Sequence, residues 1–183
     1  IAIVGVGSVL PDARDTAAFW SNLRAGRYSI SDTPADRWDL ASYYDADPHA
    51  LDKSYSKIGG WVKDASWDPI AWKLPIPPKV ADAMDGGQKW AIACTREALL
   101  DYGAPGRPLD RMRTAVILGN AMAGEKHYLT ALRVFFPDYA KALTVAPSFA
   151  SLPAEIRDAI VAESRALFGD ALPPITEDTM PGE

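Results

Sequence analysis

The sequence predicts an α/β fold, and three observations lead to this expectation. Residues 1–6 form a short apolar run that is followed by Gly7, and residues 114–118 form a second apolar run that is followed by Gly119. Apolar runs of this length are typical of strands buried on both faces of a sheet. Between them, apolar and small residues recur at steps of four and three from Val80 to Ala98, which predicts a helix. Because most of these residues are small, we expect the helix to pack closely against another backbone segment.

The first 76 residues are expected to hold one clear helix and a long irregular stretch. Asp15 or Thr16 is a suitable N-cap, Phe19 and Leu23 fall on one helical face, and Gly26 is a natural stop. Residues 27–76 show no sustained period and are rich in proline and tryptophan. Because aromatic side chains carry much apolar surface, we expect this stretch to pack onto a core.

Two helical regions are predicted in the second half. Pro77-Pro78 opens the longest pattern, the pair at Gly86-Gly87 is expected to kink it, and Gly103 ends it. A further helical region extends from about 124 to 169, with a break expected at Pro137. Pro153 is well placed at a helix start. The tail from 173 to 183 is expected to be extended.

Composition bounds the possible classes of protein. The chain has 183 residues, of which 48% are hydrophobic and 23% charged, as in a folded globular domain or a large piece of one. A net charge of −5 with scattered basic residues argues against nucleic-acid binding. No apolar stretch approaches the roughly 18 residues of a membrane span, and no signal peptide is evident. A single cysteine favours a reducing, cytoplasmic setting. With no initiating methionine, the chain is expected to be an internal segment.

Gly5-Val6-Gly7 after a predicted strand is a possible dinucleotide-binding turn, with Asp32 at a plausible distance for a ribose contact. However, the third glycine position holds Leu10, and no helix pattern begins directly at the turn. A nucleotide-binding α/β domain is therefore a disfavoured alternative, and a tight turn leaving a buried strand is the simpler interpretation.

The residues able to do covalent or metal chemistry are few. Cys94 lies on the small-residue face of the long helix, where we expect a structural cysteine and not a thiolate nucleophile. His49 and His127 are isolated from each other and from any second ligand, so both are expected at the surface and no zinc site is predicted. We therefore assign no catalytic, cofactor-binding or metal-binding residue.

An acidic loop lies between the first helix and the proline-rich segment. Its spacing does not match a calcium loop, and local turns capped by aspartate side chains are the expected structure. Arg37 is expected to pin this loop by donating to a carboxylate or carbonyl group. The acids are Asp36, Asp39, Asp45, Asp47 and Asp52.

Several blocks taken together resemble the opening of β-ketoacyl synthases, the condensing enzymes of polyketide and fatty-acid assembly. They are Phe19-Trp20, Leu23 to Gly26, Asp36-Arg37-Trp38-Asp39, Tyr43 to Pro48, Gly59-Gly60 and Met84-Asp85. Where modular polyketide ketosynthases usually have Met-Asp-Pro-Gln-Gln-Arg, this chain has Met84-Asp85-Gly86-Gly87-Gln88-Lys89. This departure and a helical insertion at about 124–172 are closer to the iterative multienzymes, such as polyunsaturated fatty-acid synthases.

The resemblance implies a thiolase-like α/β/α/β/α fold of two similar halves, of which residues 1–183 would supply most of the first. It implies an acyltransferase that performs decarboxylative Claisen condensation of acyl and malonyl units. In that family the nucleophilic cysteine and both histidines lie further along, so the remainder of the domain is expected to be absent and this segment alone inactive. Apolar strand faces would then be exposed, and the segment alone is expected to aggregate or fold poorly.

The resemblance also implies the partners. They are the rest of the ketosynthase domain, an acyl carrier protein with phosphopantetheine-linked acyl chains, and a second copy in a homodimer. No cofactor is expected to bind the segment itself. An alternative of a different class is a non-catalytic ketosynthase-like partner of the chain-length-factor type, which keeps the fold and lacks the cysteine.

Overall fold

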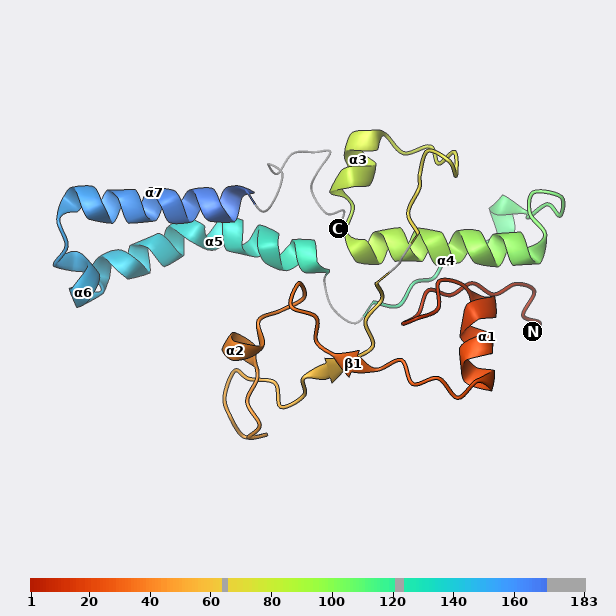
Figure 1. The fold of residues 1–183 in the computed structure, drawn as a ribbon. Helices are drawn as coiled ribbons and strands as arrows, with labels where there is room; N and C mark the ends of the chain where they lie inside the picture. Colours follow the sequence, from red (N-terminus) through yellow and green to blue (C-terminus); the bar gives the residue numbers. More distant parts are fainter. Residues whose placement is uncertain (64–65, 121–123, 171–183) are drawn as a thin grey trace. The chain divides into compact units, whose positions relative to one another are not determined.

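The computed structural model describes residues 1–63, 66–120 and 124–170 and divides into two compact units. The first unit contains residues 1–67 and 90–116, and the second contains 68–89 and the chain from 117 onward. Figure 1 gives the order of the elements. The tail predicted at 173–183 and the last residues of the predicted insertion lie outside the described residues.

Helix α1 (Thr16–Arg24) confirms the first predicted helix and both of its ends. The Asp15 carboxylate accepts a hydrogen bond of 2.7 Å from the Ala18 amide, which satisfies one of the amides that a helix start leaves without an intrahelical partner. Gly26 follows the helix with φ +63°, the left-handed conformation that glycine adopts without a steric penalty.

The two predicted buried strands do not form within the part of the chain that the structure describes. Residues 1–9 and 114–120 have no regular secondary structure. The large apolar side chains of the two predicted strands are exposed: Ile3 by 85%, Val116 by 76% and Ile117 by 91%. An apolar run becomes a buried strand only when neighbouring strands take up its backbone hydrogen bonds, and the described residues supply none for these segments.

The irregular stretch at 27–76 holds short elements that show no sequence period. Strand β1 (Ser31–Asp32) pairs antiparallel with β2 (Ile58–Gly59), with Ser31 opposite Gly59. Helix α2 (Leu40–Tyr43) lies between them. The Trp61 indole donates to the Ser31 carbonyl at 3.1 Å, and a Cβ on Gly59 would come within 2.9 Å of the Trp61 ring. Gly59 therefore leaves room for an aromatic side chain beside this small sheet, and Gly60 leaves room for Pro11.

The long helical pattern after Pro77 is two helices and not one kinked helix. Helix α3 (Pro78–Ala83) ends at Met84, which has the extended ψ of 142°, and α4 (Gly86–Tyr102) begins two residues later. The break between the two helices lies before Gly86-Gly87 and not at it, because Asp85 caps the start of α4 by accepting from the Gly87 amide. A short 3-10 helix, η1 (Arg111–Arg113), follows α4.

The helical region predicted from about 124 to 169 is confirmed, but Pro137 does not break it. Helix α5 (Glu125–Val145) continues through Pro137, and short α6 (Pro147–Ala150) leads into α7 (Ala154–Asp170), which begins directly after Pro153 as expected. Helices α5 and α7 lie side by side as a hairpin (Figure 1). The residue beside the proline, Phe136, is only 5% exposed and its ring lies 5.7 Å from that of Phe168. This packing offsets the hydrogen bond that proline removes.

The buried residues of the described chain are few and mostly small: Ala13, Thr33, Ala81, Ala93 and Phe136. A chain of this size ordinarily buries a much larger apolar core. In the ranges that the structure covers, no helix is both long and apolar enough to cross a bilayer.

Candidate functional site

The glycine pair near the N-terminus lies directly against helix α4. A Cβ on Gly7 would stand 2.2 Å from the Cys94 carbonyl oxygen, and one on Gly5 would stand 2.3 Å from that of Ala98. Real Cβ atoms do not approach carbonyl oxygens this closely. The two glycines therefore serve backbone-to-helix contact, and the small residues Cys94 and Ala98 provide the matching surface on α4.

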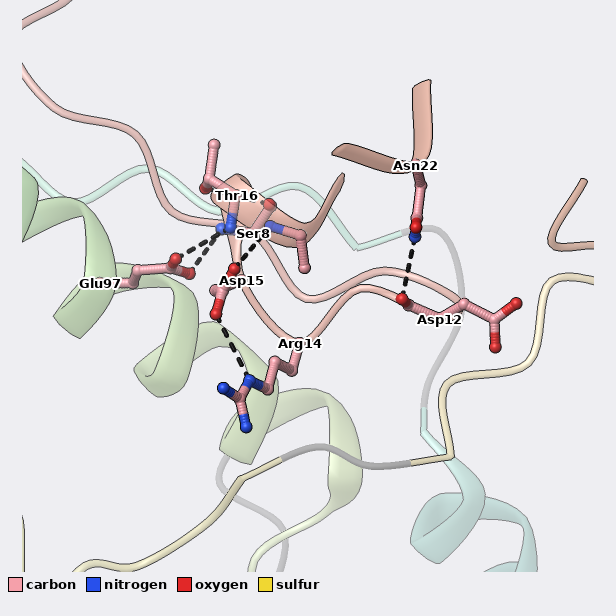
Figure 2. Close-up of polar contacts among 8 residues, drawn as sticks. Ser8, Asp12, Arg14, Asp15, Thr16, Asn22 and Glu97 are labelled. Atoms are coloured by element: carbon pink, nitrogen blue, oxygen red, sulfur yellow. Dashed lines mark hydrogen bonds and ion pairs between the residues drawn. The ribbon is translucent and has the colours of Figure 1, made fainter. Parts of the chain in front are cut away.

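Two carboxylates of α4 hold this contact by accepting backbone amides. Glu97 accepts from Ser8 at 2.9 Å through one oxygen and from Thr16 at 3.0 Å through the other (Figure 2). Asp101 accepts from Val6 at 2.9 Å. Residues four apart share a helix face, and amides two apart point the same way in extended chain. The acids therefore match the spacing of the amides.

Glu97 also fixes where helix α1 begins. Thr16 is the first residue of α1, so its amide has no intrahelical partner and takes the Glu97 carboxylate instead. The Ser8 and Thr16 hydroxyls lie 3.1 Å apart beside it. One side chain thus joins the N-terminal segment, α1 and α4.

This geometry removes the basis for a dinucleotide site. In such a site, backbone amides after the first strand face a pyrophosphate at a helix N-terminus. Here the amides of Val6 and Ser8 face the carboxylates of Asp101 and Glu97, which repel an anion. Residues 5–7 also form no turn, which differs from the tight turn that we expected.

A cavity of about 480 Å³ lies between the loop at 9–14, helix α1 and residues 62–63. Its charged lining residues are Asp12, Arg14, Arg27 and Lys63. Arg27 donates to Asp12 at 3.3 Å. Arg14 lies 3.5 Å from Asp15 in an exposed ion pair (Figure 2). Both arginines therefore have a carboxylate partner already.

The residues considered for covalent and metal chemistry remain apart. Cys94 is half-buried in α4, where its carbonyl faces Gly7. His49 and His127 are both exposed, and the His127 ring meets Tyr128 edge-on at 5.8 Å. Across the described ranges, no three acids, histidines or cysteines gather as metal ligands. That Cys94 is structural stays a prediction.

The acidic loop folds as the sequence predicted. Asp45 accepts from the Asp47 amide and Asp47 from the His49 amide, each at 2.9 Å. Arg37 donates to the Val62 carbonyl at 2.9 Å, which confirms its expected pinning role.

Asp39 makes the densest set of contacts in this loop. It caps α2 by accepting from the Ala41 and Ser42 amides at 3.1 Å and from the Ser42 hydroxyl at 2.5 Å. The hydroxyl bond, followed by the amide bonds, lowers the pKa of the Asp39 carboxyl below its ordinary 3.8.

Sequence reasoning missed Glu97 and Asp101, the two residues that organise the N-terminal contact. The available signal was their spacing of four on a helix whose neighbouring positions, Cys94 and Ala98, are small. Acidic residues beside a small-residue surface of a helix are suited to accept hydrogen bonds from backbone amides. A chain segment that packs closely on such a surface has amide groups that need acceptors.

Comparison with known proteins gives one family match. Residues 1–152 match the family described as "Beta-ketoacyl synthase, N-terminal domain". Among curated proteins, polyketide synthase PksL of Bacillus subtilis is 38% identical over 121 residues, which is 66% of this chain and 3% of PksL. A phenolphthiocerol/phthiocerol polyketide synthase of Mycobacterium tuberculosis is 36% identical over 149 residues, covering 80% of this chain and 9% of that protein.

Among solved structures, the oxazolomycin ketosynthase domain OzmH KS7 of Streptomyces albus JA3453 is 40% identical, with a TM-score of 0.47. The match covers 54% of this chain and 17% of that one. The chain thus spans less than a tenth of the curated relatives and about a sixth of the solved chain.

Proposed function

Because this chain belongs to the β-ketoacyl synthase family, we propose that it forms the N-terminal part of a ketosynthase that condenses acyl and malonyl units in polyketide biosynthesis. The observation that carries the proposal is the match of residues 1–152 to the N-terminal domain of that family. Family membership also confirms the expected fold class, a partial α/β fold of the thiolase-like type. The curated relatives at 36–38% identity are polyketide synthases, which favours polyketide over fatty-acid assembly.

We assign residues 1–183 to the first portion of the ketosynthase domain, with the remainder supplied by polypeptide outside this chain. The exposure of the apolar runs at 1–6 and 114–118 supports this assignment, because such runs are stable only when strands pair with them and helices cover them. The hairpin of α5, α6 and α7 corresponds to the insertion expected at about 124–172. In this proposal it is an addition to the shared scaffold.

The reaction would be a decarboxylative Claisen condensation. A cysteine takes the acyl chain from the phosphopantetheine arm of an acyl carrier protein, and two histidines support loss of CO₂ from a malonyl thioester. The resulting enolate attacks the acyl thioester, and the cysteine thiolate leaves. Such a step needs an activated thiolate and donors for the developing oxyanion. We place these groups outside this chain, so the chain itself is a scaffold that is inactive alone.

The proposal includes the partners and setting of the complete enzyme. An acyl carrier protein presents the substrates, the ketosynthase is a homodimer, and the assembly works in the cytoplasm. No cofactor is assigned to this segment, because its carboxylates face its own backbone and its cavity arginines pair with acids.

The test is a condensation assay with the full-length protein, a malonyl-loaded carrier protein and an acyl donor. Formation of a β-ketoacyl carrier protein with release of CO₂ supports the proposal. Absence of both product and decarboxylation contradicts an enzymatic role and favours the chain-length-factor type of partner. Substituting the downstream nucleophilic cysteine should abolish condensation, whereas Cys94→Ala should leave it unchanged.

The assignment to a partial domain makes a separate prediction about residues 1–183 alone. Exposed apolar runs with unpaired backbone favour association between copies. We expect broad, early-eluting species in size-exclusion chromatography and no cooperative thermal transition. A monodisperse monomer that melts cooperatively would contradict the assignment.

A further inference from the structure

One carboxylate, that of Asp85, lies at the start of two helices that are distant in sequence. It is the residue before α4, and one of its oxygens accepts from the Gly87 amide at 2.8 Å. The Gln88 side-chain carbonyl in turn accepts from the Asp85 amide at 2.9 Å. This reciprocal pair is a capping box, which satisfies two amides that the start of α4 would otherwise leave without partners.

The second Asp85 oxygen serves helix α5. It accepts from the Lys126 backbone amide at 3.0 Å across 41 positions of sequence. Lys126 is in the first turn of α5, so its amide has no carbonyl partner within that helix. Asp85 is thus the acceptor for the first turns of both α4 and α5, where the positive ends of the helix dipoles favour a negative charge.

The Lys126 side chain reaches the end of a third helix. Its ammonium group donates to the carbonyls of Asp82 and Ala83, in the last turn of α3. Partial burial, followed by the nearby charge of Lys89, lowers the pKa of Lys126. Cations are favourable at helix C-termini, so this contact complements the dipole of α3.

Gly124 allows the close approach on which this arrangement depends. Its φ of −69° and ψ of 175° are open to any residue, so backbone conformation does not require glycine there. Space does: a Cβ at Gly124 would lie between 2.1 and 2.4 Å from the three carboxylate atoms of Asp85. Glycine at 124 and aspartate at 85 therefore depend on each other.

We propose that Asp85 is a positioning residue that sets where helix α5 begins against the α3–α4 turn, with Gly124 as the residue that makes room for it. The helical hairpin is then anchored at its first turn by one side chain of the Met84-Asp85 block. The expected effect of Asp85 on condensation rests on the proposed ketosynthase function. The effect of Asp85 on the start of α5 can be measured whether or not the protein condenses acyl units.

The test is a double-mutant cycle of Asp85→Ala and Gly124→Ala in the full-length protein, read by hydrogen exchange at the Lys126 amide. Asp85→Ala removes the acceptor of that amide, and we expect its exchange to accelerate about thirtyfold, because one hydrogen bond to a charged group is lost. Gly124→Ala should accelerate it at least as much by displacing the carboxylate. In the Asp85→Ala background the same change meets no carboxylate, so its added effect should be under about twofold.

Two matched controls separate this role from general destabilisation. Gly86→Ala changes a glycine in the same turn that has open space around it, and Asp158→Ala removes an exposed carboxylate from α7. Both should leave exchange at Lys126 unchanged. Asp85→Asn keeps one carbonyl acceptor and should preserve protection at only one of the Gly87 and Lys126 amides.

Additive effects of the two substitutions, or wild-type exchange at Lys126 in Asp85→Ala, would overturn the inference. Condensation activity gives the functional arm: Gly124→Ala should lower the turnover number, and adding Asp85→Ala should cause little further loss. A wild-type protein without condensation activity would count against the proposed function, while the exchange cycle would still decide the role of Asp85.

Discussion

Glu97→Gln perturbs the carboxylate that joins the N-terminal segment and α1 to α4. In the native chain its two oxygens accept from Ser8 at 2.9 Å and Thr16 at 3.0 Å. Glutamine keeps one carbonyl acceptor and turns an NH₂ group toward the other amide. A hydrogen bond to a charged group contributes about 1.5–3 kcal/mol and a neutral one about 1 kcal/mol. The amide that keeps the carbonyl therefore loses about 1 kcal/mol, and the amide that faces the NH₂ group loses its whole bond, about 2 kcal/mol.

Hydrogen exchange measured by NMR on the full-length protein reads this loss directly, because neither amide has another acceptor within a helix or sheet. A loss of about 2 kcal/mol corresponds to exchange roughly thirtyfold faster at the amide that faces the NH₂ group. Glu97→Ala should expose both amides. Glu155→Gln, at an exposed position of the first turn of α7, is the matched control and should change neither. Wild-type exchange at Ser8 and Thr16 in Glu97→Gln would refute the reasoning.

Three further predictions concern other positions. Gly7→Ala should destabilise the contact with α4 by about 1–3 kcal/mol through overpacking, measured as a lower urea midpoint, whereas Gly119→Ala, with open space around it, should not. Alkylation of Cys94 by iodoacetamide should be slow at pH 7 in the folded protein and become fast in urea; equal rates would show that the thiol is freely reactive. Asp39 has a lowered pKa in the folded chain, so its contribution to α2 is present above the ordinary pKa of 3.8 and is lost as pH falls through the lower folded value. An NMR titration of its carboxyl carbon should therefore give a midpoint below 3.8, and Ser42→Ala should raise that midpoint.

Much of the helical structure follows from local sequence. Asp15 and Gly26 mark the ends of α1 because a cap and a left-handed glycine act within one turn of chain. Pro153 marks the start of α7 for a similar local reason. The resemblance to β-ketoacyl synthases was also available from short blocks, and the family match over residues 1–152 confirms it.

The corrections share a physical cause, which is that the deciding partner lies far away in sequence. Pro137 is tolerated inside α5 because Phe136 packs on α7, and local propensity cannot register that packing. The apolar runs at 1–6 and 114–118 have strand-like composition, but a strand exists only through hydrogen bonds to another strand.

The sequence by itself determined the family, the places of most helices and the local turns of the acidic loop. Only the tertiary structure decided what Gly5, Gly7 and Gly124 are for. Each of these glycines makes room for a backbone or carboxylate from another part of the chain. A glycine in the sequence shows only that the position has no side chain. The group that fills the space a side chain would take comes from a distant part of the chain, so only the fold identifies it.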